Sequence, residues 1–82
     1  MPTIMIDGSD YASPKEMHLA LKRMLSLPEY YGCNADALND CLSERREPVS
    51  LWIAGTGTGD VAAALDIIRE VIEDNGGTVK EL

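Results

Sequence analysis

One apolar run restricts the folds that this chain can adopt: residues 49–54 read VSLWIA. A run of this kind predicts a strand that is buried on both faces, as the strands of parallel sheets are. Helical patterns precede and follow it, over residues 13–25, 34–43 and 61–74. Helices that separate strands imply parallel pairing through right-handed crossovers. The sequence therefore predicts an α/β fold.

Two shorter strands complete the predicted sheet. Residues 3–6 are apolar and stop at an Asp-Gly turn signal, and residues 78–82 follow the sequence Asn-Gly-Gly and are polar enough for an edge strand. We expect a single small domain over residues 1–82, with a three-stranded parallel sheet packed by helices in the order β-α-α-β-α-β. A chain of 82 residues buries only about 60–65% of its unfolded surface, so a second domain or a cofactor cleft has little room.

Capping signals predict where the helices begin. Ser13 and Glu16 form a capping-box pattern, and the proline between them fits the first helical position. Asn34 is the predicted N-cap of the second helix and Asp60 that of the third.

The charge of the chain favours a basic partner. Fourteen acidic and seven basic residues give a net charge of −7, and a basic stripe for phosphate backbones is absent from the sequence. This composition argues against nucleic-acid binding. A negative field suits a cationic protein and speeds its encounter. The alternative explanation of the negative charge is that it keeps the protein soluble.

The two cysteines predict free thiols and a reducing compartment. Cys33 and Cys41 lie eight residues apart on one predicted helix start, roughly 12 Å between Cα atoms, too far for a disulfide. A zinc site would need further Cys or His ligands nearby. The N-terminal residues do not resemble a signal peptide, and the sequence has no apolar run of membrane length. We therefore expect a cytoplasmic protein without a metal or another cofactor.

An acidic pair follows two adjacent tyrosines. Asp36 and Asp40 stand four residues apart, so they share one face of the second helix, close to Tyr30. A solvated helix face explains such a pair, and Asp36 would also complement the positive end of the helix. A face that is presented to a basic partner explains it equally well.

Residues 27–42, LPEYYGCNADALNDCL, resemble the ribonuclease-inhibitor segment of the barstar family, nearly in register. His18, Pro48, Trp52, Arg69 and Glu70 also fall where that family has like residues. The resemblance implies a non-enzymatic inhibitor that plugs the basic active site of a small bacterial ribonuclease or toxin nuclease, as an immunity protein in a one-to-one complex. The partner-binding residues that it implies are Tyr30, Gly32, Asn34, Asp36, Asp40 and Glu70, with Asp40 as the central anion.

The chain departs from the family pattern at several points. Asn39 and Arg45 stand at two positions in or beside the interface that usually hold tryptophan, so we include both among the partner-facing residues. Cys33 replaces a residue that is often acidic. The segment between the second strand and the last helix is several residues shorter, and the loop at residues 55–59 replaces a small helix. These changes indicate a different partner nuclease.

The sequence leaves two other functions open. The glycine-threonine loop, GTGTG at residues 55–59, stands between a strand and a helix, where exposed backbone N–H groups can bind phosphate. It lacks the Lys-Ser/Thr of a P-loop, and Asp60 would repel phosphate, so we predict a structural turn. A generic acidic module for a basic protein other than a nuclease is the further alternative. His18, the only histidine, is predicted to pack or hydrogen-bond rather than to catalyse.

Overall fold

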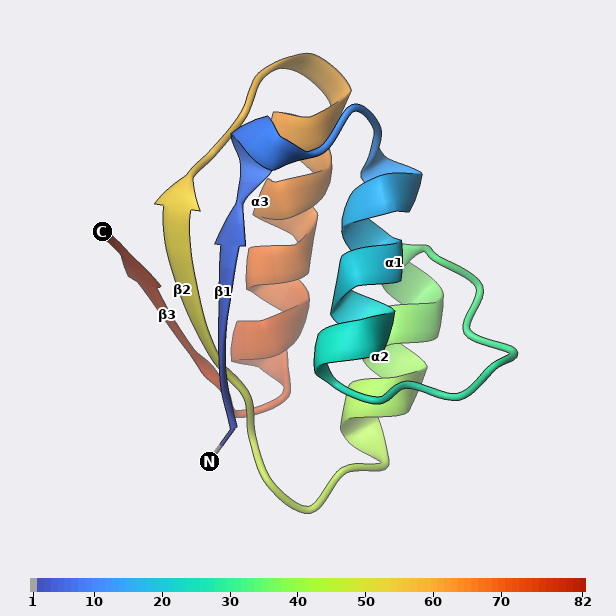
Figure 1. Cartoon of the computed structure of the whole chain (residues 1–82). Helices are drawn as coiled ribbons and strands as arrows, with labels where there is room; N and C mark the ends of the chain where they lie inside the picture. The colour runs from blue at the N-terminus through green and yellow to red at the C-terminus, as the bar shows by residue number, and fades with distance from the viewer. Residues whose placement is uncertain (1) are drawn as a thin grey trace.

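The computed structural model describes residues 2–82, and it confirms the predicted α/β class and the order of the elements. The elements are β1 (Thr3–Asp7), a 3-10 turn (Gly8–Asp10), α1 (Pro14–Met24), α2 (Ala35–Ser43), β2 (Ser50–Gly55), α3 (Gly59–Asp74) and β3 (Thr78–Glu81). The three strands form one parallel sheet in the order β1-β2-β3. Figure 1 shows the sheet as one layer and the helices as the other.

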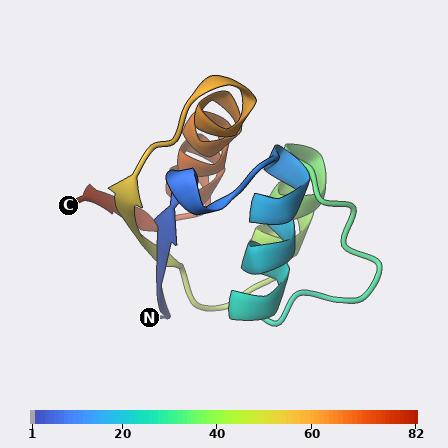
Figure 2. The ribbon, with the colours of Figure 1, turned by 45° about the horizontal axis from the view of Figure 1, so that its top comes forward.

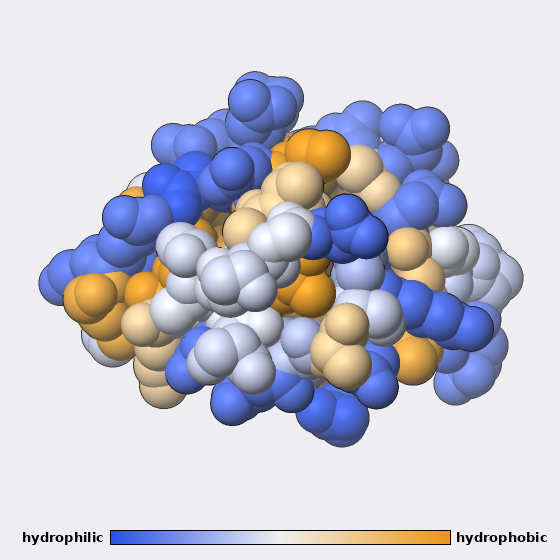
Figure 3. Space-filling model, turned by 90° about the horizontal axis from the view of Figure 1, so that it is seen from above, coloured by the Kyte–Doolittle hydropathy of each residue, from blue (hydrophilic) through white to orange (hydrophobic). Residues whose placement is uncertain are grey.

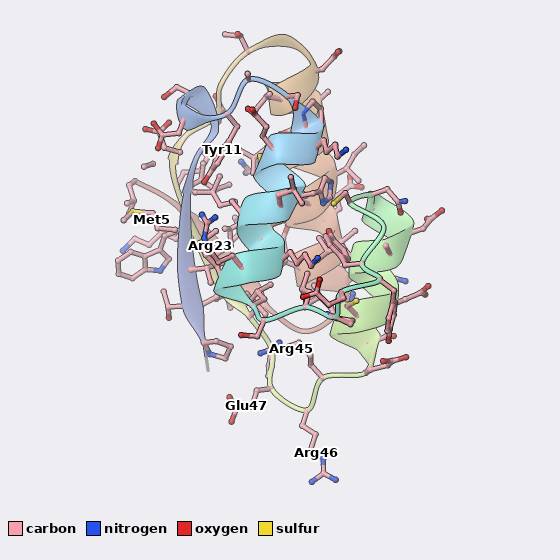
Figure 4. The ribbon with its side chains drawn as sticks, turned by 45° about the vertical axis from the view of Figure 1, so that its right-hand side comes forward. Met5, Tyr11, Arg23, Arg45, Arg46 and Glu47 are labelled. Atoms are coloured by element: carbon pink, nitrogen blue, oxygen red, sulfur yellow. The ribbon has the colours of Figure 1, made fainter. Side chains whose placement is uncertain are left out.

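The sheet is covered on one face only, so the prediction that β2 is buried on both faces is wrong. Leu51 and Ile53 are buried, whereas Trp52 is 40% exposed and Ala54 is also exposed. The strand order explains this outcome, because two successive crossovers of the same hand that advance across a sheet place their helices on the same side. The helices lie together on that side in the raised view of Figure 2. Met5 points away from them (Figure 4).

The core lies between the sheet and the three helices. Every second residue of β1 and β2 faces the helices, as strand geometry requires. The core residues with at most 2% exposure are Ile6, Met17, Leu21, Leu38, Val49, Leu51, Ile53, Leu65, Ile68 and Ile72. They come from two strands, the segment before β2 and all three helices. This continuous core fixes how α2 sits on the molecule.

Two of the three predicted helix starts are confirmed. The hydroxyl of Ser13 accepts a hydrogen bond from the N–H of Glu16 (3.3 Å), and the Glu16 carboxylate accepts one from the N–H of Ala12 (2.7 Å). The side chain of Asn34 accepts from the N–H of Ala37 (2.8 Å). The third prediction is wrong. Thr58 is the N-cap of α3, without a side-chain cap bond, and Asp60 lies inside the first turn. Its charge still complements the helix dipole there.

The glycine-threonine loop packs closely against the turn after β1. A Cβ atom added at Gly8 would lie 2.6 Å from the backbone carbonyl of Thr56, and Gly57 adopts a left-handed φ of 71° beside Gly8. Glycine is required on both sides because the two backbones touch. Figure 3, which looks onto this end of the molecule, shows apolar residues near the middle of a hydrophilic rim. The close backbone approach accounts for these glycines without a ligand.

Candidate partner-binding surface

Helix α2 presents its acidic pair to solvent. Asp36 and Asp40 are exposed, and Leu38 and Leu42 are buried on the opposite side of the helix. The cap made by Asn34 fixes the first turn. The carboxylates therefore stand on a backbone held by a cap at one end and by two core leucines. We call Asp36 and Asp40 the acidic pair.

The loop before α2 packs against that helix at Gly32 and exposes Tyr30 to solvent. Tyr30 is 82% exposed, whereas Tyr31 is buried at 6%. The carbonyl of Gly32 accepts a hydrogen bond from the side-chain amide of Asn34 (3.2 Å), and a Cβ atom at Gly32 would lie 3.5 Å from that of Ala37. The structure thus brings Gly32 and Asn34 together, with Tyr30 two residues before Gly32, next to the N-terminal end of the acidic pair's helix.

A buried hydrogen bond holds this loop to α1. Nδ1 of His18 and the hydroxyl oxygen of Tyr31 lie 2.6 Å apart, and both side chains are buried. Burial lowers the pKa of His18 and, as the largest cause, raises the pKa of Tyr31, so the pair is neutral near pH 7. On the surface, the ammonium of Lys22 donates to the carbonyl (3.4 Å) and carboxylate (3.3 Å) of Glu29. The packing role predicted for His18 is confirmed.

Asn39 and Arg45 each have an intramolecular partner. The side-chain oxygen of Asn39 accepts a hydrogen bond from the amide of Asn75 (2.9 Å), which joins α2 to the end of α3. The guanidinium of Arg45 donates to the carbonyl of Leu25 (3.0 Å) just after α1. Figure 4 shows Arg45 close to this end of α1, whereas Arg46 extends away from the molecule. Asn39 and Arg45 are both exposed, yet Asn39 ties α2 to the end of α3, and Arg45 ties the segment after α2 to the end of α1.

Glu70 lies on α3 rather than on α2 or its loop. It is exposed, while Leu65, Ile68 and Ile72 of the same helix are buried. The bond between Asn39 and Asn75 places the C-terminal part of α3 alongside α2. Glu70 therefore stands on a helix that neighbours α2, and it is not a member of the acidic pair.

The sequence analysis missed Ile67, which is 48% exposed on α3. The sequence contained the signal, because an isoleucine at this position lies outside the apolar stripe that the helical period assigns to the core.

Within residues 2–82, no helix has the length and apolar character that a membrane span requires. Cys33 and Cys41 are free thiols, as predicted.

Two comparisons with known proteins bear on this surface. The family model described as Barstar (barnase inhibitor) matches residues 1–80. A curated protein of Bacillus subtilis (strain 168), named "Putative ribonuclease inhibitor YrdF", is 49% identical over 43 residues. The match covers 52% of this chain and 47% of that protein, so the chain spans about half the length of this relative.

Proposed function

The chain belongs to the barstar family, whose members are inhibitors and not enzymes, and we propose that it inhibits a small basic ribonuclease by occluding the active site in a one-to-one complex. In this complex the acidic pair enters the basic cleft of the enzyme. Tyr30, Gly32 and Asn34 flank it on the loop side, and Glu70 flanks it on α3. Asp40 is the central anion.

The acidic pair on a supported helix is the observation that carries this proposal. Asp36 and Asp40 are exposed on a helix that is capped by Asn34 and anchored in the core by Leu38 and Leu42. A carboxylate on a rigid element loses little entropy when it binds, and it forms charge-assisted hydrogen bonds with arginine, lysine or histidine. Tyr30, at 82% exposure in the loop before this helix, offers rigid apolar area to a partner.

The net charge supports the same type of partner. The chain carries −7 in all, and α3 adds exposed Asp66, Glu70, Glu73 and Asp74 to the charges of α2. A ribonuclease cleft is basic because it binds phosphates, so the two potentials are complementary. Charge complementarity of this kind increases association rates and rejects acidic competitors.

We further propose that the protein acts in the cytoplasm as the immunity partner of a bacterial ribonuclease or toxin nuclease. The two free thiols support a reducing compartment. An inhibitor of this kind protects the cell that makes the nuclease, which requires tight binding before the enzyme meets cellular RNA.

The proposal is tested by titrating the protein into a panel of purified small basic ribonucleases that includes barnase. The measurement is cleavage of a fluorogenic RNA. We expect activity to fall to zero at one equivalent for at least one enzyme. The matched control, with Asp36→Asn and Asp40→Asn combined, should require far more protein. Unchanged cleavage by every enzyme at micromolar inhibitor would contradict the proposal.

A further inference from the structure

A second feature lies at the start of the helix that carries the acidic pair: a pocket of about 200 Å³ between the N-terminal half of α1, the start of α2 and the middle of α3. The side chains of Pro14, His18, Cys33, Ala35, Ala64 and Ile67 form most of its wall. These residues are apolar or weakly polar, and His18 is already bonded to Tyr31 through Nδ1. Among residues 2–82, no charged carboxylate or ammonium lines this pocket.

Ile67 makes the pocket unusual for a solvated surface. Its side chain remains 48% exposed, next to the wall formed by Ala64. A single exposed isoleucine is ordinary on a protein surface. An exposed isoleucine at the edge of an apolar concavity is different, because both surfaces can be buried by one inserted side chain.

The pocket is continuous with the proposed interface. Asn34 and Ala35 line it, and Asp36 is the next residue of α2. Its volume is below the roughly 300–1,000 Å³ of sites for small ligands and cofactors, which favours one side chain over a free metabolite. Interfaces between proteins typically surround an apolar anchor with polar and charged contacts. The pocket and the acidic pair have this arrangement.

We propose that this pocket receives one large apolar side chain of the same ribonuclease, next to the cationic residues that meet Asp36. The inference rests on the proposed function and adds a specificity determinant to it. The acidic pair can bind any basic cleft. The pocket favours nucleases that carry an apolar residue at the rim of the cleft over nucleases that carry a charged residue there. Specificity of this kind arises because an inserted charge would be desolvated without a partner.

Two substitutions test the pocket from opposite directions. Ile67→Ala removes the apolar rim, and Ala64→Leu fills the pocket. Each should weaken the complex about tenfold with the panel enzyme that wild type inhibits most tightly, since roughly half of an isoleucine's buried apolar area is lost or blocked. Met5→Ala is the matched control, because Met5 is 54% exposed on the open sheet face. It should leave the dissociation constant unchanged.

The melting temperature and the conservative variant Ile67→Leu separate binding from folding. Ile67→Leu should bind within twofold of wild type. Ala64→Leu should weaken binding even if its melting temperature equals or exceeds that of wild type. If Ile67→Ala and Ala64→Leu bind as Met5→Ala does while Asp36→Ala is weakened, the pocket is empty in the complex and this inference is wrong, although the proposed function stands. If none of the panel enzymes is inhibited by wild type, both fail together.

Discussion

His18 on α1 and Tyr31 in the loop before α2 are joined by a buried hydrogen bond, with 2.6 Å between Nδ1 and the phenolic oxygen. The neighbouring residue Tyr30 is 82% exposed, whereas Tyr31 is 6% exposed. One tyrosine of the pair therefore anchors the loop, and the other is presented to solvent. The conformation of the proposed binding surface depends on a residue that lies far from it in the sequence.

The His18–Tyr31 bond predicts a stability that depends on pH. Burial lowers the pKa of His18 below its ordinary value of 6.5, so the unfolded chain binds a proton more readily than the folded chain. The contribution of His18 to the free energy of unfolding should be fully present above pH 6.5. The free energy of unfolding should fall as the pH drops below 6.5, by at most about 1.4 kcal/mol per pH unit. Urea unfolding at pH 7.5 and pH 5.5 measures this change. A His18→Gln variant with the same pH dependence would contradict the prediction.

Association with the nuclease should be steered by charge. The net charge of −7 predicts an association rate that falls steeply between 50 mM and 500 mM salt, while the dissociation rate changes much less. Stopped-flow mixing with the panel enzyme measures both rates. Asp10→Ala, which removes a distant exposed charge, should reduce the salt dependence only slightly. A rate that is independent of salt would mean that the surface charge is incidental.

The glycine-threonine loop should not bind phosphate. Its glycines are explained by the approach of Gly57 to Gly8, and Asp60 follows in the first turn of α3. Phosphate, ATP and GTP at millimolar concentration should therefore leave the melting temperature unchanged, whereas a specific ligand raises it by mass action. A melting temperature that climbs with nucleotide concentration would support the phospho-ligand alternative.

Local signals in the sequence predicted most of the fold. The capping residues Ser13 and Asn34 and the polar last strand are short-range features, and their predictions are confirmed. The exposed face of β2 was missed because VSLWIA has no alternation of polarity, so only the placement of the helices decides that Trp52 meets solvent. Thr58, and not Asp60, is the N-cap because α3 begins at Gly59, two residues before the predicted start at Val61. Gly59 has a left-handed φ of 58°, which glycine adopts without strain.

The part of the candidate site that depends on local spacing was predictable from the sequence. The spacing of Asp36 and Asp40 places them on one face, and the structure exposes both. The contacts of Asn39 with Asn75 and of Arg45 with Leu25 span 36 and 20 residues. Such contacts follow from tertiary packing, and local sequence patterns do not predict them.

Replacing Asn39 and Arg45 together by tryptophan should shift the preference toward barnase. Arg45 is a cation that a basic cleft repels, and Asn39 offers no aromatic area, so we expect wild type to bind its own nuclease far more tightly than barnase. Asn39→Trp with Arg45→Trp should strengthen barnase binding at least tenfold. The double variant should also lose about 1 kcal/mol of stability for each hydrogen bond removed. Tight barnase inhibition by wild type would show that the acidic residues alone select the partner.

Calorimetry of alanine variants tests most directly whether the acidic pair binds the nuclease. Asp40→Ala should weaken the complex most, by at least about thirtyfold, because it leaves desolvated cations of the enzyme unpaired. Asp36→Ala and Glu70→Ala should follow with smaller losses, and Asp10→Ala should bind as wild type does. Four equal and small losses would contradict the proposed role of the acidic pair, because they would show that the protein acts through its overall charge and not through Asp40.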